Sequence, residues 1–229
     1  ADIQERIACE KPDVVGITSM FTLQRKNMHK VVQLVKNVNK GTKVIVGGAH
    51  PTSAPEDVLS DKNVDAIIMG EGENSIHPLV QALIHGYDLK KLDGVWFKSG
   101  NNYIINEKKN VIQDLDSIPF PARHLLPMEK YINAEFRHGG RNRTTRATSF
   151  ITSRGCQYRC NFCTAFKVFT RVPRMRSVEN VVKELQLLVD DYNIEEIYFE
   201  DDQIIAKQRH TGELFDTLRE RFNLKWDTP

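Results

Sequence analysis

Three apolar runs in the first 70 residues are separated by amphipathic stretches, and two of them end in glycine-containing loops. The runs cover residues 13–19, 43–46 and 64–69; the second ends in Gly47-Gly48 and the third in Gly70-Glu71-Gly72. Buried strands alternating with helices predict an α/β fold with a doubly wound parallel sheet. Because ligands bind beyond the carboxyl ends of the strands in such sheets, both loops are predicted to lie at a ligand-binding edge.

Amphipathic helices are predicted to connect these strands. One carries Met28, Val31, Val35 and Val38 on its apolar face, and the other carries Ile76, Leu79, Val80 and Leu83. Residues 94–106 then have the pattern of a β-hairpin with a Gly/Asn turn. Neither glycine loop contains the Gly-x-Gly-x-x-Gly pattern of dinucleotide-binding domains.

A second α/β pattern begins near Arg146. It consists of a strand at 147–152, a helix opened by Ser177 as N-cap, a strand at 197–199, a helix over 207–222 and a strand at 224–226. This βαβαβ succession is typical of (β/α) barrels, but it is too short to close one. We therefore expect a fragment of a longer enzyme: 1–112 a partial Rossmann-like domain lacking its first strand, 113–145 a proline-containing linker, and 146–229 the truncated first β/α units of a barrel.

Three cysteines, Cys156, Cys160 and Cys163, lie within eight residues directly behind the predicted strand 147–152. Three thiolates without a fourth leave a bound metal with an open coordination position, which favours chemistry over scaffolding. A closed zinc site uses four ligands, and Cys9 is far away in the sequence. A disulfide within this odd-numbered cluster and chance clustering of buried cysteines are two further interpretations.

The run Cys-x-x-x-Cys-x-x-Cys, preceded by Thr-Ser-Arg-Gly, resembles the cluster loop of the radical S-adenosylmethionine (SAM) enzymes. The resemblance implies that the three cysteines hold a [4Fe–4S] cluster whose fourth iron binds SAM, and that an electron from the cluster cleaves SAM. It also implies that Phe162 packs near the adenine and that Glu200 and Asp202 hold SAM. The cysteine loop and the acidic triplet 200–202 follow successive parallel strands, so both are predicted to face the same mouth; the alternative is that the acids only solvate a loop.

The segments 47–52 (Gly-Gly-Ala-His-Pro-Thr) and 65–73 (Asp-Ala-Ile-Ile-Met-Gly-Glu-Gly-Glu) together look like the cobalamin (B12)-binding domain that precedes the barrel in one subgroup of radical SAM enzymes. The resemblance implies a pocket for the nucleotide tail of cobalamin lined by Thr18, Ser19, Gly47, Gly48, Gly70, Glu71 and Gly72. The Asp-x-His-x-x-Gly motif that supplies an axial histidine in many cobalamin domains is absent from the sequence. His50 is expected to be a hydrogen-bonding residue. From the residues alone, tight turns and a helix dipole also explain the glycines and carboxylates.

These resemblances imply methyl transfer to an unactivated carbon of a small-molecule substrate: methylcobalamin donates the methyl group, a 5′-deoxyadenosyl radical abstracts a hydrogen, and a flavodoxin or ferredoxin supplies electrons. An oxidative cyclase of the magnesium-protoporphyrin monomethyl ester type is the alternative with a similar domain order. A tRNA methylthiotransferase would need a second cysteine triad, and the front domain has only Cys9. The alternative from another class is a non-catalytic metal- or cobalamin-binding module.

The net charge of +2 hides an uneven distribution, because the segment from Arg137 to Arg176 contains basic residues and no Asp or Glu. Such a run forms a phosphate-binding surface for nucleic acid, a solvated loop face, or a charge complement to an anionic cluster. We favour the last because the run brackets the cysteines, so a nucleic-acid partner is not expected. No apolar run approaches the ~20 residues of a membrane span, and no targeting pattern opens the sequence. A cytoplasmic, reducing location is expected.

Overall fold

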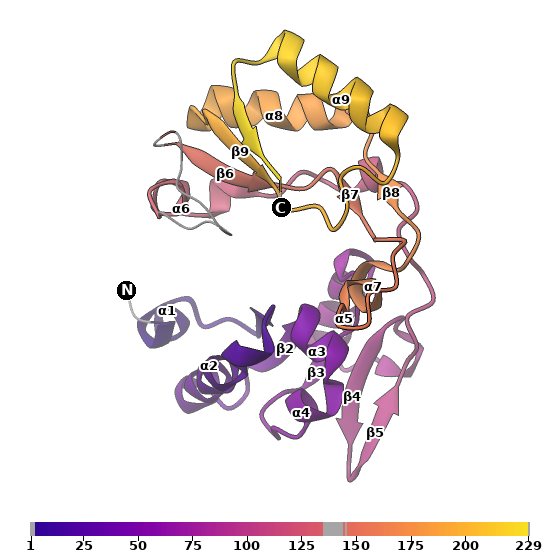
Figure 1. Ribbon diagram of the computed structural model, residues 1–229. Helices are drawn as coiled ribbons and strands as arrows, with labels where there is room; N and C mark the ends of the chain where they lie inside the picture. The colour runs from indigo at the N-terminus through magenta and orange to yellow at the C-terminus, as the bar shows by residue number, and fades with distance from the viewer. Residues whose placement is uncertain (1–2, 135–143, 145, 229) are drawn as a thin grey trace. The chain divides into compact units, whose positions relative to one another are not determined.

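The structure is a computed structural model that describes residues 3–134, 144 and 146–228 (Figure 1). The chain divides into two compact units. Unit 1 extends to Ile112 and also takes in Phe162–Phe169, whereas unit 2 consists of Gln113–Asn161 and the residues from Thr170 onward. Arg137, Arg141 and Arg143 of the basic run lie outside the described residues.

Unit 1 contains a five-stranded sheet with the order β1-β2-β3-β4-β5. Its elements are α1 (Ile3–Glu10), β1 (Val14–Thr18), α2 (Arg25–Val38), β2 (Lys43–Gly47), α3 (Ala49–Ser53), α4 (Pro55–Leu59), β3 (Ala66–Ile68), α5 (Glu73–His85), β4 (Val95–Ser99), β5 (Asn102–Ile105) and α7 (Ala165–Phe169). The strands β1, β2 and β3 are parallel, as predicted. The predicted hairpin at 94–106 is present as β4 and β5, and it extends the parallel sheet in the antiparallel direction, which the sequence did not predict. Every residue of β3 is buried, so its backbone groups need partners on both sides, and β4 supplies those on one side.

Helices cover both faces of this sheet. Val44, Val46 and Ile67 pack in one core with residues of α1, α2 and α4, while Ile45 and Ile68 pack in a second core with α5. This alternation along β2 and β3 is the period of two expected of strands that are buried on both faces.

The buried face of α2 is rotated by one position from the prediction. Met28, Val32 and Val35 are its buried residues, and this i, i+4, i+7 spacing keeps all three on one side of the helix. Val31 is only partly buried and Val38 is exposed.

Unit 2 is built on a parallel three-stranded sheet with the order β10-β9-β6. Its elements are α6 (Met128–Ile132), β6 (Ala147–Phe150), β7 (Ser153–Arg154), β8 (Arg174–Met175), α8 (Val178–Tyr192), β9 (Glu196–Phe199), α9 (Gln208–Arg221) and β10 (Lys225–Asp227). Figure 1 shows α8 and α9 side by side over this sheet. The predicted βαβαβ succession is present, and Ser177 caps α8 by accepting from the Asn180 N–H. The described residues form an open sheet, and no closed barrel is present among them.

The core of unit 2 lies between the sheet and its two long helices. Phe150 and Phe199 pack edge to face, with ring centroids 6.3 Å apart, and Leu185 and Leu214 of the helices are fully buried against them. Residues Met128 and Ile132 of α6 belong to the same core. In the described part of the chain, no helix is long and apolar enough to cross a membrane.

Candidate functional site

At the carboxyl ends of β1 and β2 in unit 1, two loops touch through their backbones. The Ser19 N–H donates to Gly47 O (2.8 Å), and the His50 N–H donates to Ser19 O (3.0 Å). Gly48 lies between these bonds at φ 109°, and a Cβ at this position would lie 2.7 Å from Ser19 O. Both the left-handed backbone and the contact therefore require glycine here.

Thr52 links this pair of loops to the loop after β3. Its Oγ1 donates to Gly48 O (2.8 Å) and accepts from the Gly70 N–H (3.0 Å). Gly70 has φ 63°, and a Cβ there would lie 3.2 Å from Val168 O in α7. The predicted residues Gly47, Gly48 and Gly70 are thus gathered at one sheet edge, which we call the glycine cradle (Ser19, Gly47, Gly48, Thr52 and Gly70).

The Ser19 side chain in the cradle is buried, and its Oγ has no hydrogen-bond partner within the described residues. Such a hydroxyl is costly unless something satisfies it. Met20, Phe21 and Leu23, which follow directly, are exposed apolar side chains. Thr18, at the end of β1, is exposed. The buried Ser19 hydroxyl can hydrogen-bond a polar part of a ligand, and the exposed apolar side chains beside it can contact an apolar part. These residues therefore fit a large organic ligand with a polar tail, such as cobalamin.

Glu71 and His50 at the same edge are engaged within the protein. Glu71 is buried, and its Oε2 accepts from the Ile112 N–H (3.3 Å). His50 is also buried; its Nδ1 lies 3.3 Å from Thr22 Oγ1. Its Nε2 lies 3.2 Å from Asp57 Oδ2 but has no hydrogen-bond partner within the described residues. His50 therefore has the expected hydrogen-bonding role through Nδ1. Gly72 is the N-cap residue of α5.

The three cysteines of the second motif are free thiols. Cys156 and Cys160 belong to unit 2, while Cys163 belongs to the segment assigned to unit 1. Cys160 and Phe162 are exposed, and the Cys156 N–H donates to Thr170 O (3.4 Å). Three free thiols are suitable donors for an iron–sulfur cluster. Within the described ranges no three His, Cys, Asp or Glu side chains form a preassembled metal site, so the ligand assignment stays a prediction.

The acidic triplet 200–202 meets the segment that leads into the cysteine loop. β6 and β9 are parallel neighbours with Phe150 opposite Phe199, so the residues that follow both strands come together, as predicted. Asp201 is buried and accepts from the Thr152 N–H (3.1 Å to each Oδ) and the Thr152 hydroxyl (2.8 Å). Burial raises the pKa of Asp201 above its usual value, against the opposing effect of these hydrogen bonds.

The two predicted SAM-binding acids, Glu200 and Asp202, are both exposed. The Asp202 carboxylate also accepts from the Gly155 N–H; partial desolvation, and then the charge of Asp201, raise the pKa of Asp202. The sequence prediction passed over Asp201, the one acid of the three that is buried. The signal that could have revealed it is the pair of hydroxyl residues, Thr152 and Ser153, just after the neighbouring strand.

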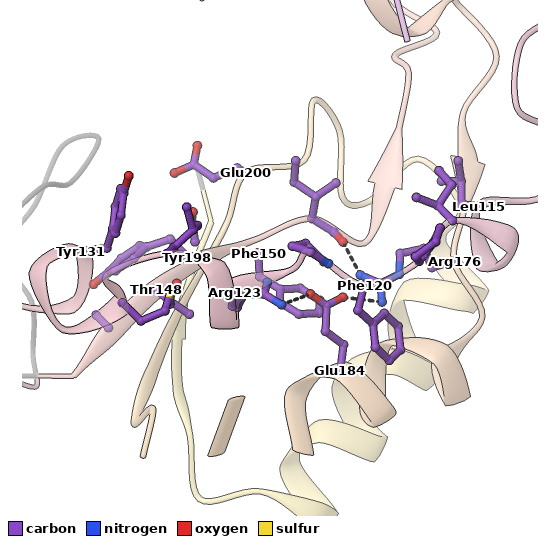
Figure 2. Close-up of a pocket in the computed structure, with 18 of the residues that line it drawn as sticks. Leu115, Phe120, Arg123, Tyr131, Thr148, Phe150, Arg176, Glu184, Tyr198 and Glu200 are labelled. Atoms are coloured by element: carbon purple, nitrogen blue, oxygen red, sulfur yellow. Dashed lines mark hydrogen bonds and ion pairs between the residues drawn. The ribbon is translucent and has the colours of Figure 1, made fainter. Parts of the chain in front are cut away.

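A pocket of about 830 Å³ lies within unit 2, and Glu200 is one of its lining residues. Figure 2 shows Glu184 at its base between Arg123 and Arg176. The two arginines approach opposite oxygens of this buried carboxylate at 2.6 Å each. The Arg176 guanidinium also lies over the rings of Phe120 (5.6 Å) and Phe150 (5.2 Å). Arg176, predicted to be part of a basic run around the cysteines, is thus committed to an internal ion pair.

Comparison with known proteins identifies the front of the chain. Residues 1–80 match the family model "B12 binding domain". The chain carries the B12-binding domain of cobalamin-dependent radical SAM enzymes. It is 34% identical over 239 residues to cytidylyl-2-hydroxyethylphosphonate methyltransferase of Streptomyces wedmorensis, covering 95% of this chain and 45% of that protein.

Two further relatives agree with this assignment. The anaerobic magnesium-protoporphyrin IX monomethyl ester cyclase of Rubrivivax gelatinosus is 31% identical over 197 residues, covering 84% of this chain and 34% of that protein. The solved structure of the cobalamin-dependent SAM radical enzyme OxsB with aqua-cobalamin has a TM-score of 0.80 at 22% identity, covering 98% of this chain and 31% of that chain; this shows a shared fold. The chain spans less than half the length of these relatives.

Proposed function

We propose that this chain serves in a cobalamin-dependent radical SAM enzyme that transfers a methyl group to an unactivated carbon of a small molecule. The observation that carries the proposal is the buried Ser19 hydroxyl of the glycine cradle, which has no partner among the residues that the structure describes, in the same chain as a loop of three free thiols. The first fits a cobalamin tail and the second fits a [4Fe–4S] cluster with one open iron.

Each predicted residue has a role in this proposal. Cys156, Cys160 and Cys163 ligate the cluster, and the exposed Phe162 ring is available to stack on the adenine of SAM. Glu200 and Asp202 accept hydrogen bonds from the SAM ammonium group, which as a cation favours neighbouring carboxylates. When bound, the cluster supplies the electron that cleaves SAM and cobalamin supplies the methyl group; a flavodoxin or ferredoxin is the proposed electron donor, and the rest of the barrel the proposed substrate site.

An oxidative cyclase is the second candidate, favoured by the 31% identity to the Rubrivivax cyclase. It would use the same cradle and cysteine loop, so the product formed decides between the two. A non-catalytic cobalamin- or metal-binding module remains the alternative outside enzymes. A methylthiotransferase is less well supported, because the second cysteine triad that it needs has no counterpart in unit 1, where Cys9 lies exposed in α1.

Anaerobic reconstitution with iron, sulfide and cobalamin tests the proposal. We expect about four irons per chain and one bound cobalamin. Cys160→Ala should lose the iron and keep cobalamin, because it leaves unit 1 unchanged. Cys9→Ala is the matched control and should retain both. Full iron content in Cys160→Ala would exclude the ligand assignment, and one zinc per chain with no iron would favour the module.

With both cofactors loaded, the products then separate the enzymatic candidates. SAM labelled in its methyl group should transfer label to an added acceptor if the chain, or the longer protein containing it, is a methyltransferase. Cleavage of SAM to 5′-deoxyadenosine without label transfer would favour the cyclase.

A further inference from the structure

The segment that leads into the cysteine loop is held on one side by carboxylates from the loop after β9. Asp201 accepts hydrogen bonds from the N–H and hydroxyl of Thr152 and from the hydroxyl of Ser153. Asp202 accepts from the Gly155 N–H, and Gly155 has φ 94°. The segment from 152 to 155 is thus connected to two neighbouring acids, and Cys156 follows directly.

The same segment is also held from its other side. β7 pairs with β8 in antiparallel fashion, with Ser153 opposite Met175. The Arg176 N–H donates to Thr152 O (2.9 Å). Because backbone pairing fixes one side and a buried carboxylate fixes the other, the start of the cysteine loop has little freedom to shift.

Burying the Asp201 carboxylate has a cost in desolvation free energy, which suggests that the hydrogen bonds it makes have a functional role. A buried carboxylate requires well-oriented donors, and Asp201 is 4% exposed. Its partners are side-chain hydroxyls and backbone N–H groups of the segment ahead of the cysteines. In metal sites, hydrogen bonds from residues behind the ligands fix the orientation of the ligands themselves.

We propose that Asp201 is a positioning residue for the cluster, holding Thr152 and Ser153 so that the cysteine loop begins from a fixed base. The inference rests on the proposed function, because it assumes that the loop binds a cluster. Asp201 itself touches neither cluster nor SAM in this proposal; Glu200 and Asp202 keep the contacts with SAM. The effect of losing Asp201 is therefore a cluster in altered geometry and of weaker retention, with its three ligands intact.

Glu196 provides a matched control at the opposite end of the same strand. It is a buried carboxylate that accepts from the Thr144 N–H (2.9 Å) and lies 3.3 Å from the Thr144 hydroxyl. This repeats the bonding of Asp201 to Thr152, at the amino end of β9 rather than its carboxyl end. Glu196→Gln should therefore disturb unit 2 in a similar way without touching the base of the cysteine loop.

The test compares Asp201→Asn with Glu196→Gln in the reconstituted full chain. Asp201→Asn should release iron to a chelator about tenfold faster or more and should change the g values of the reduced cluster in its electron paramagnetic resonance spectrum. Glu196→Gln should show the wild-type spectrum and release rate. If Asp201→Asn matches the wild type in both measurements while folded, the inference is wrong.

Hydrogen exchange of the apo chain separates this inference from the proposed function. The Thr152 amide should exchange about tenfold faster in Asp201→Asn, whereas in Glu196→Gln only Thr144 should be affected. If the wild type takes up no cluster, the proposed function fails, and unchanged Thr152 exchange in Asp201→Asn would independently refute the anchoring of the segment. Should Asp201→Asn not fold, Ser153→Ala, which removes one donor and keeps the carboxylate, should show the same shifts at smaller size, and a wild-type cluster signal in it would count against the proposal.

Discussion

The two units shape the carboxyl edges of their sheets by different means. In unit 1 the loops after β1, β2 and β3 approach through backbone atoms, at Gly48 and Gly70, where any side chain would intrude. In unit 2 the loops after β6 and β9 are joined by one buried carboxylate, Asp201, which accepts hydrogen bonds from Thr152. In the proposed function the first edge binds a large ligand, and the second fixes the base of the loop that carries the cluster ligands. The stability of unit 1 should therefore fall when a side chain is added at Gly48 or Gly70. The stability of unit 2 should fall when the charge of a buried carboxylate is removed.

The largest effect should come from removing the buried charge that Arg123 and Arg176 share. Glu184→Gln leaves two partly buried cations without an anion and should destabilise unit 2 by about 3 kcal/mol, measured by denaturant unfolding. The chain has two tryptophans, Trp96 in β4 and Trp226 in β10, so Trp96→Phe leaves fluorescence that reports on unit 2.

Glu179→Gln is the matched control for this charge effect. Glu179 pairs with Lys183 at 2.7 Å on the surface of α8, with both side chains exposed, and such pairs are screened by water. Its unfolding midpoint should equal that of the wild type. Equal unfolding midpoints for Glu184→Gln and Glu179→Gln would show that the buried Glu184 charge does not stabilise unit 2.

An added methyl group at the cradle should have the next largest effect. Gly48→Ala combines a left-handed backbone with a Cβ 2.7 Å from Ser19 O, and should cost about 2 kcal/mol or more in the stability of unit 1. Cobalamin affinity should fall by at least about tenfold, corresponding to about 1.4 kcal/mol. Gly16→Ala is the control, since Gly16 lies in β1 outside the cradle and a Cβ there meets nothing within 4 Å. Similar cobalamin titrations for the two variants would argue against the cradle as the binding edge.

Gly70 tests whether the segment after Cys163 depends on the cradle. Gly70→Ala should cost about 1–2 kcal/mol from its positive φ and should loosen α7, because its Cβ would lie 3.2 Å from Val168 O. Gly86 has a similar φ of 73° with nothing within 4 Å, so Gly86→Ala carries the backbone strain alone. Hydrogen exchange in α7 should rise in Gly70→Ala only; the same rise in both variants would assign the effect to strain.

The difference between the units also explains what the sequence could predict. Apolar runs and glycine loops revealed β1, β2 and β3. For β2 and β3 the reason is that a strand buried on both faces has consecutive apolar residues. The prediction that the strand at 13–19 is buried is wrong, because no residue of β1 is buried. The N-cap at Ser177 could be predicted because capping depends only on residues close in the sequence. The pairing of β4 with β3 could not be predicted, because the alternation of residues within a hairpin does not specify which strand lies beside it.

The candidate site shows the same division. The three cysteines were predicted as ligands from their spacing along the chain, and the cradle glycines from their place after apolar runs and the resemblance to cobalamin-binding domains. Asp201 was missed because its burial depends on Thr152 and Ser153, which lie 49 and 48 positions away. Glu200 and Asp202 were chosen because of the resemblance to radical SAM enzymes. Because β9 ends at Phe199, the alternation of a strand does not determine which of the three acids that follow points inward.

The smallest effect, of opposite sign in the two units, should appear in the pH dependence of stability. In unit 1, burial would raise the pKa of Asp93, but hydrogen bonds from the Lys109 N–H, Lys108 and the Asn110 N–H lower it below 3.8. Its stabilising contribution is present above pH 3.8 and is lost as the pH falls through the folded-state pKa.

In unit 2, burial raises the pKa of Asp201 above 3.8. The folded state then holds the Asp201 proton more tightly than the unfolded state, so the contribution of Asp201 to stability is greatest below pH 3.8 and is lost as the pH rises through its folded-state pKa. The Tm difference between wild type and Asp93→Asn should shrink on acidification, read from Trp96 in a Trp226→Phe background. The difference between wild type and Asp201→Asn should shrink as the pH rises from 3.8, read from Trp226 in a Trp96→Phe background. The same sign in both units would mean that Asp201 is not held in the dry, carboxylate-anchored environment that distinguishes the cysteine-loop edge from the glycine cradle.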